Sequence, residues 1–227
     1  MDLKNINYFN NKIRNGISKV KNCNTKIIYN PWGTVTGRLT TEKNSFPILT
    51  LNKELRSLIK PQNDVFVEFD FNAAELRVLL GLLEQEQPKE DIHTWISKNI
   101  FNDTFNREQT KKKVFSWLYN PKAQNKKLNE YLNRDKIYEE NFVSGYVHTP
   151  YGRVIPVEKD KAVNYLIQST SSDMLLTSAM NISRELSDKK SFVSFCIHDS
   201  VVLDISTEEK NLIEELAKKF SGTKFGN

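Results

Sequence analysis

The apolar and polar positions change from one period to another within residues 64–83. Residues 65–69 alternate between two faces, with Phe66 and Glu68 on the same one, which predicts a strand. Beyond Asp70 the apolar residues recur at helical spacing, at Ala74, Leu76, Leu79, Leu80 and Leu83. Asp70 is therefore expected at the rim of a sheet, where an ionised carboxylate needs a cation or a donor. This stretch alone leaves two interpretations open, a metal ligand and a helix N-cap.

A second polar tip between apolar segments lies near the end of the chain. The tripeptide His-Asp-Ser at 198–200 is flanked by the mostly apolar residues 194–197 and 201–205, a pattern typical of a hairpin with a polar turn. If this hairpin neighbours the first strand in one sheet, Asp70 and Asp199 meet at a shared edge. Two adjacent carboxylates repel each other unless a divalent cation lies between them. The pair therefore predicts a magnesium site of the kind used in two-metal phosphoryl transfer.

The same periodicity predicts the other elements. A basic amphipathic helix is expected over residues 1–22, with an apolar stripe that must pack on this chain or on another one: Ile6, Phe9, Ile13, Ile17 and Val20. The further predictions are a strand at 26–29, a short helix within 47–60, a hairpin at 146–157, a long helix at 164–185 with its apolar residues, Met180 among them, facing inward, and a final helix at 207–220.

Composition narrows the class of protein only slightly. The 227 residues carry a net charge of +5, a mild basic bias that is compatible with nucleic acid but weak as evidence for it. The hydrophobic share of 38% suffices for a folded core. Cys23 and Cys196 form neither a disulfide framework nor a zinc motif. Without a membrane-length apolar run or a signal peptide, we expect a cytoplasmic protein with no membrane partner.

Five segments, in this order, resemble the family A (Pol I-like) DNA polymerases. The segment TGRLTT at 36–41 resembles the element ahead of motif A, and DFNAAELR at 70–77 resembles motif A. Residues 107–119 keep the R-x3-K-x3-F-x3-Y spacing of motif B, NYLIQST at 164–170 resembles the N-x3-Q-G-T stretch, and HDS at 198–200 resembles motif C. The resemblance covers roughly residues 26 to 206.

The resemblance implies an α+β fold: an antiparallel polymerase palm sheet backed by helices, with a reduced helical fingers subdomain. The expected parts are an N-terminal amphipathic helix (1–24), a first palm part with motif A (25–90), the reduced fingers with motif B (91–145) and a second palm part with motif C (146–227). Only one helix precedes TGRLTT, where the family carries a long thumb. We therefore expect a thumb-less or split phage-type enzyme in the host cytoplasm, without proofreading, whose thumb and exonuclease come from a second protein chain.

The resemblance also implies roles for individual residues. Asp70, Asp199 and the backbone carbonyl of Phe71 would hold two Mg²⁺ ions, for which Mn²⁺ can substitute, and Lys111 would join the aspartates in catalysis by protonating pyrophosphate. The residues implied to bind the dNTP are Arg107, Lys111, Phe115, Tyr119, Glu75 as a steric gate against ribonucleotides, and His93. Those implied to bind primer-template DNA are Arg38, Arg56, Arg153, Asn164, Gln168 and His198.

Ordinary structural roles stay open for several of these residues. Arg38 could form a surface salt bridge, Glu75 could be an exposed helix residue paired with Arg77 or a lysine, and residues 107–119 could be a solvated basic helix. Structural polar or packing roles stay open for His93, Asn164 and Gln168.

The function expected from these patterns is template-directed transfer of nucleotides from dNTPs to a primer 3′-hydroxyl by a two-metal mechanism. One alternative is a non-catalytic DNA-binding or assembly subunit with a degenerate polymerase fold, supported by four departures from the family: Ser200 for an acid, Ala73 for Gln, Asn120 for Gly and Asp160 for Arg. A single-subunit RNA polymerase is the other alternative, against which Glu75 and the TGRLTT segment argue.

Overall fold

The computed structural model describes residues 3–21, 23–120 and 122–225, with side chains from residue 11 onward. The elements before the long helix are α1 (Leu3–Lys21), β1 (Tyr29–Asn30), β2 (Thr40–Thr41), α2 (Lys53–Arg56), β3 (Val65–Asp70), α3 (Ala74–Leu82), α4 (Ile92–Asn99), α5 (Arg107–Tyr119), α6 (Lys126–Tyr131), α7 (Arg134–Asn141), β4 (Phe142–Val143), β5 (Tyr146–His148) and β6 (Val154–Pro156). After a short 3₁₀ helix (Lys159–Lys161) come α8 (Ala162–Glu185), β7 (Phe192–Ile197), β8 (Ser200–Ile205), a second 3₁₀ helix (Thr207–Leu212) and α9 (Ile213–Ser221).

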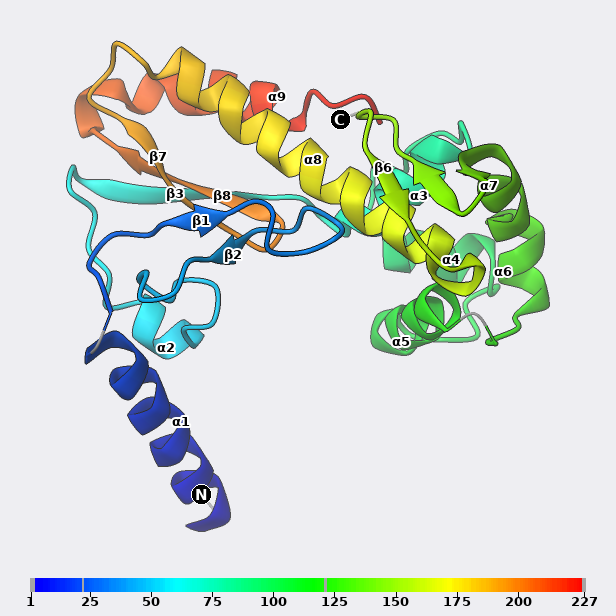
Figure 1. The fold of residues 1–227 in the computed structure, drawn as a ribbon, viewed down its shortest axis with the longest axis horizontal. Coiled ribbons are helices and arrows are strands. Elements are labelled where there is room, and N and C mark those ends of the chain that lie inside the picture. The colour runs from blue at the N-terminus through cyan, green and yellow to red at the C-terminus, as the bar shows by residue number, and fades with distance from the viewer. Residues whose placement is uncertain (1–2, 22, 121, 226–227) are drawn as a thin grey trace.

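The central sheet has the strand order β3-β8-β7, with both pairings antiparallel (Figure 1). Strand β8 lies in the middle, and its first residue, Ser200, pairs with Asp70 at the end of β3. The predicted strand and hairpin are therefore neighbours, and the predicted meeting of their polar ends follows from this register. The predicted fold class, an antiparallel sheet combined with helices, is confirmed.

The two faces of this sheet are covered differently. Helices α8 and α9 pack on one face through Leu175, Ile182, Leu216 and Phe220, which meet Val201 and other residues of β8 (Figure 1). A second apolar cluster joins the sheet residues Phe66, Phe195 and Val202 to Ile48 and Tyr29 from the N-terminal segment. Burial on both faces explains why all of β8 is buried.

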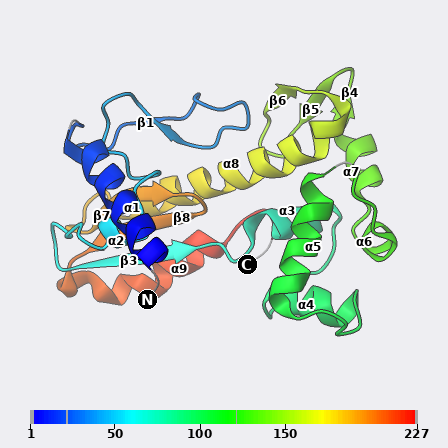
Figure 2. The ribbon, with the colours of Figure 1, turned by 90° about the horizontal axis from the view of Figure 1, so that it is seen from below.

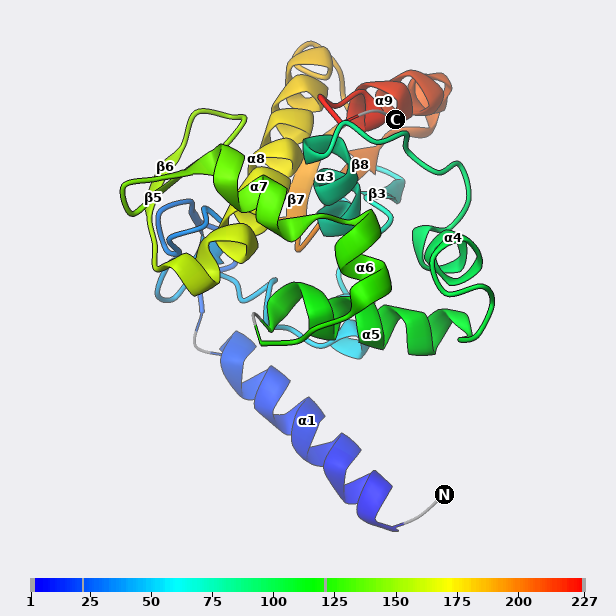
Figure 3. The ribbon, with the colours of Figure 1, turned by 90° about the vertical axis from the view of Figure 1, so that its right-hand side faces the viewer.

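The N-terminal half of α8 leaves the sheet and enters a helical region made by α3 to α7 (Figures 2 and 3). The core there contains Trp117 and Leu118 of α5, Leu128 of α6, Ile137 of α7 and Leu166 of α8. One helix thus connects the sheet with the region predicted as fingers. The boundaries of the four predicted parts stay a prediction.

Helix α1 projects away from the rest of the chain (Figures 1 and 3). Its C-terminal half packs on α2: Gly16 is buried against Leu55, where a Cβ atom would lie 2.3 Å from Leu55 Cδ1. Ile17 nevertheless keeps 43% of its surface exposed. The side chains of Ile6 and Phe9, which the sequence assigns to the same stripe, lie outside the described residues.

Three details differ from the predicted pattern. The strand expected at 26–29 is reduced to Tyr29–Asn30, the final helix begins at Ile213 after a 3₁₀ turn, and Met180, expected to face inward, is 52% exposed. The hairpin at 146–157, the short helix and the long helix form as predicted. Among the described helices, none is long and apolar enough to cross a membrane.

Candidate active site

Asp70 and Asp199 are brought to the same edge by the pairing of β3 with β8. Asp70 is the last residue of β3, and Asp199 occupies the turn that leads into β8. The backbone N–H of Phe71 donates to the carbonyl of Asp199 at 3.3 Å, which continues the ladder into the turn. His198 adopts a left-handed φ of 52° there, so that the chain reverses within two residues. The two segments that resemble motifs A and C therefore touch through their backbones.

The interpretation of Asp70 as an N-cap is wrong. Helix α3 has its N-cap at Ala73, which has a φ of 54° and makes no side-chain capping bond. The side chain of alanine cannot accept a hydrogen bond from a backbone N–H, so the helix begins without the usual side-chain cap. Asp70 therefore does not cap this helix.

The surroundings of Asp70 favour a cation. Burial raises the pKa of this carboxyl, and the negative charges of Asp199 and Glu68 raise it further, whereas His198 acts in the opposite direction. A divalent cation would relieve this repulsion, and carboxylate and backbone carbonyl oxygens are the ligands that Mg²⁺ uses together with water. The described residues contain no cluster of three or more His, Cys, Asp or Glu side chains arranged to hold a metal ion. The residues present therefore suit a divalent cation that two carboxylates hold and whose other coordination positions stay open.

Glu75 and Arg38 form an ion pair beside these aspartates. Glu75 is only 7% exposed, and its Oε1 lies 2.6 Å from Nη2 of Arg38. Burial raises the pKa of Glu75, and the charge of Arg38 counteracts this rise. The charge of Asp199 raises the pKa further, so Glu75 also interacts electrostatically with the motif C turn. The alternatives of an exposed Glu75 and of a Glu75–Arg77 pair are wrong, because Arg77 donates to the carbonyl of Asn72.

A pocket of about 310 Å³ lies at this junction. It is lined by Arg38, Leu39, Leu49, Ser172, Leu175, His198 and Asp199. The pocket connects the TGRLTT segment with the motif C turn and with α8. His198, at its edge, is exposed.

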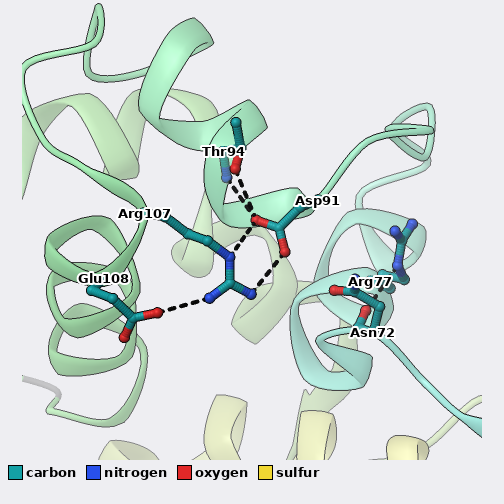
Figure 4. Close-up of polar contacts among 6 residues, drawn as sticks. All are labelled: Asn72, Arg77, Asp91, Thr94, Arg107 and Glu108. Carbon is teal, nitrogen blue, oxygen red and sulfur yellow. Dashed lines mark hydrogen bonds and ion pairs between the residues drawn. The ribbon is translucent and has the colours of Figure 1, made fainter.

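Arg107 and Asp91 connect α5 to the start of α4 (Figure 4). Asp91 is the N-cap of α4 and accepts from the backbone N–H of Thr94 at 3.0 Å. The same carboxylate accepts from Nε and Nη2 of Arg107 at 3.1 and 2.9 Å, while Nη1 donates to Glu108 at 2.8 Å. Burial alone would raise the pKa of Asp91, but the bonds from Arg107 and Thr94 outweigh it and hold this pKa well below its usual value.

The other members of the predicted stripe lie in line along α5. The rings of Phe115 and Tyr119 are parallel with centroids 5.6 Å apart, and Nζ of Lys111 lies 6.0 Å from the Phe115 centroid. His93 of α4 packs against Phe115 at 5.8 Å and is 2% exposed, and burial lowers its pKa. Lys111, Phe115 and Tyr119 therefore form one row of side chains along α5, with the buried His93 behind Phe115.

Arg153, one of the predicted DNA contacts, is engaged within the protein. Its Nε and Nη2 donate to the carboxylate of Asp173 at 2.8–2.9 Å, and its guanidinium lies against Gly37 of the TGRLTT segment. Ser172, which precedes Asp173 on α8, donates to the carbonyl of Gly37 at 2.7 Å. These contacts fix the TGRLTT segment on α8.

The remaining predicted DNA contacts are spread over the fold. Asn164 and Gln168 are half-buried on α8, and among the described residues no partner is found for the buried Oδ1 of Asn164. Arg56 lies in the last turn of α2. Within the described part of the chain, no side-chain hydrogen bond or ion pair joins Arg56 to the other candidate residues.

Two acidic residues near the site were missed by the sequence predictions. Glu68 accepts a hydrogen bond from the hydroxyl of Ser200 at 2.7 Å, and Asp173 holds Arg153. Strand alternation could have identified Glu68, because it lies two residues before Asp70 and therefore on the same face. Asp173 gave no comparable signal.

An antiparallel sheet with aspartates at the ends of two adjacent strands, next to helices with a basic and aromatic stripe, has the architecture of a polymerase palm and fingers. Comparison with known proteins agrees with this class. The chain is 22% identical over 240 residues to DNA polymerase I of Caldicellulosiruptor bescii, a match that covers 82% of this chain and 28% of that protein.

Its structure is similar to that of the polymerase domain of Pol1 from M. smegmatis in complex with DNA primer-template and dNTP, with a TM-score of 0.68 and 16% identity. That match covers 85% of this chain and 43% of the other one. No family model matches the sequence. The chain thus spans less than a third of the curated relative, and the resemblance to the core of a family A polymerase is confirmed.

Proposed function

We propose that this chain catalyses template-directed DNA synthesis, with Asp70 and Asp199 at its centre. In the reaction the primer 3′-oxygen attacks the α-phosphorus of a dNTP, and the bond to the β-phosphate oxygen breaks to release pyrophosphate. The observation that carries this proposal is the pairing of β3 with β8, which joins the ends of the two strands that resemble motifs A and C.

Asp70, Asp199 and the backbone carbonyl of Phe71 would hold two Mg²⁺ ions, with Mn²⁺ as a substitute. The oxygen donors, and the burial and charge repulsion that together raise the pKa of Asp70, support this assignment. When bound, such ions stabilise the charge on both the attacking and the leaving oxygens.

The stripe on α5 would bind the incoming nucleotide. Arg107 and Lys111 would neutralise its phosphates, and Lys111 would donate a proton to the departing pyrophosphate. Phe115 would lie against the sugar and Tyr119 against the new base pair. The continuous arrangement of these side chains along one helix supports the assignment. His93, packed behind Phe115, would support this surface close to the phosphates.

Glu75 would exclude ribonucleotides, held in place by Arg38. The pocket between Arg38 and Asp199 supports a role for this pair close to the reacting groups. The primer-template would run past Arg38, Arg56, Arg153, Asn164, Gln168 and His198. Synthesis without proofreading, a second protein chain that supplies a thumb, and a phage origin stay predictions.

The proposed function is tested by primer extension with the full chain, Mg²⁺ and dNTPs. Extension is expected, and Asp199→Ala should abolish it while binding of the primer-template persists. If the chain alone does not extend the primer, candidate partner chains are added to the reaction. Binding of DNA without extension, even with partners that bind the chain, would instead establish the alternative of a non-catalytic DNA-binding or assembly subunit.

A further inference from the structure

The proposed active site carries serine where the family it resembles carries an acid. Ser200 is the first residue of β8 and is 4% exposed, directly after Asp199. Its hydroxyl donates to Oε1 of Glu68 at 2.7 Å and also contacts the carbonyl of Ile197 at 3.0 Å. A carboxylate is therefore present next to position 200, but it comes from the neighbouring strand.

The strand register explains how Glu68 reaches this place. Asp70 pairs with Ser200, and Glu68 pairs with Val202. Residues directly opposite each other in an antiparallel pair point to the same face, as do residues two apart on one strand. Glu68 and Ser200 are therefore diagonal neighbours on the face that carries Asp70, within reach of a glutamate side chain.

We propose that Glu68 takes over the function of the missing acid, so that the third carboxylate of the site is carried by β3 in place of β8. This inference rests on the proposed function, because it concerns the same cation site. The Ser200 hydroxyl holds the Glu68 carboxylate toward the edge where Asp70 and Asp199 meet, and the added negative charge strengthens the binding of a divalent cation there.

Glu68 acts in this proposal as a positioning residue and not as a metal ligand. No group of three acidic or histidine ligands is assembled among the described residues, so its charge acts from beside the two aspartates. Outer carboxylates of this kind orient ligands and raise metal affinity, and removing one typically weakens metal binding by about 10- to 100-fold. A purely structural role, in which the Ser200–Glu68 bond only ties β3 to β8, makes a different prediction.

The experiment measures binding of Mn²⁺ alone to the full chain by electron paramagnetic resonance, without DNA or nucleotide. Glu68→Gln keeps the side-chain shape and removes the charge, and we expect the affinity for Mn²⁺ to fall by about tenfold or more. Glu214→Gln, an exposed glutamate on α9, is the matched control and should bind as the unmodified chain does. Urea unfolding without metal reports any structural effect of each substitution separately.

A rescue distinguishes charge from structure. The variant Glu68→Ser should lose affinity, and adding Ser200→Glu should restore it, because the acid then returns to the strand on which the family carries it. Equal Mn²⁺ affinity in Glu68→Gln and the unmodified chain, or a failure of Ser200→Glu to restore binding, would overturn the role of Glu68. If instead Asp70→Asn leaves Mn²⁺ binding unchanged, the cation site itself is wrong and the proposed function fails with it.

Discussion

Arg38 holds Glu75 by an ion pair in which Nη2 and Oε1 lie 2.6 Å apart. The two residues come from the TGRLTT segment and from the first turn of α3, which are 37 positions apart in the chain. Glu75 is 7% exposed, so its carboxylate is held in one orientation beside the motif C turn. A side chain fixed in this way can exclude a 2′-hydroxyl sterically, which a freely rotating one does poorly.

We therefore predict that Glu75→Ala relaxes the selection against ribonucleotides. The ratio of kcat/KM for an rNTP to that for the matching dNTP should rise by about 10- to 100-fold, the range typical of shape discrimination by one side chain. Single-nucleotide incorporation measures this ratio. Glu214→Ala, on the distant α9, is the control, and an unchanged ratio in Glu75→Ala would show that the gate lies elsewhere.

The strands and helices could be predicted because burial imposes a period on the sequence. Residues 65–69 form β3, as their alternation predicted, and α8 was predicted from its apolar spacing. Met180 shows where this reasoning failed: it lies in the half of α8 that packs on the sheet, but Leu175 and Ile182 occupy the face toward the sheet and Met180 is on the exposed side. The left-handed backbone conformation of Ala73 could not be predicted either, because alanine has no special preference for a positive φ.

The candidate site was predictable where one element alone determines it. The spacing of residues 107–119 places four side chains on one helical stripe, and the structure agrees. The partners of those side chains were not predictable, because Asp91–Arg107 and Asp173–Arg153 depend on how separate elements pack. Glu68 falls between these cases: its face was predicted, but its bond to Ser200 required the register of β3 and β8.

Gly37→Ala should destabilise the chain more than Gly152→Ala. Both glycines have a left-handed φ, 74° and 85°, which costs a Cβ-bearing residue about 1 kcal/mol or more. At Gly37 the new Cβ would also lie 2.6 Å from Cζ of Arg153, whereas at Gly152 nothing lies within 4 Å. Since Asp173 holds Arg153, the clash cannot relax without loss of that ion pair.

Urea unfolding of the two variants measures this difference. We expect a loss of about 1 kcal/mol for Gly152→Ala and about 2–3 kcal/mol for Gly37→Ala. Equal losses would show that the TGRLTT segment moves freely over Arg153.

Asp91→Ala should destabilise the chain in a way that depends on pH. The pKa of Asp91 is lowered in the folded state, so its contribution to stability is present above the unfolded pKa and is lost as pH falls toward the folded value. At pH 7 we expect a loss of about 1 kcal/mol, mainly from the N-cap bond to Thr94, since the ion pair with Arg107 is largely exposed.

The difference in the free energy of unfolding between the unmodified chain and Asp91→Ala should therefore become smaller below about pH 4. Asp91→Asn separates the two causes, because asparagine keeps the capping acceptor and lacks the charge. Its stability should stay above that of Asp91→Ala at every pH. A difference between the unmodified chain and Asp91→Ala that is constant from pH 7 to pH 3 would exclude the carboxylate charge as its source.

Lys111→Ala should slow the chemical step far more than Lys112→Ala. Both lysines are exposed on α5, but only Lys111 lies in line with Phe115 and Tyr119, where its Nζ faces the Phe115 ring at 6.0 Å. Lys112 is turned by about 100° around the helix, away from that surface.

If Lys111 donates the proton to pyrophosphate, its loss should lower the single-turnover rate by about 10²- to 10⁴-fold, and the deficit should persist at saturating dNTP. Rapid-quench incorporation of one nucleotide measures this rate. A purely electrostatic role in binding would instead raise the dNTP concentration needed for half-saturation and leave the maximal rate intact, and equal effects of the two substitutions would remove Lys111 from the proposed mechanism.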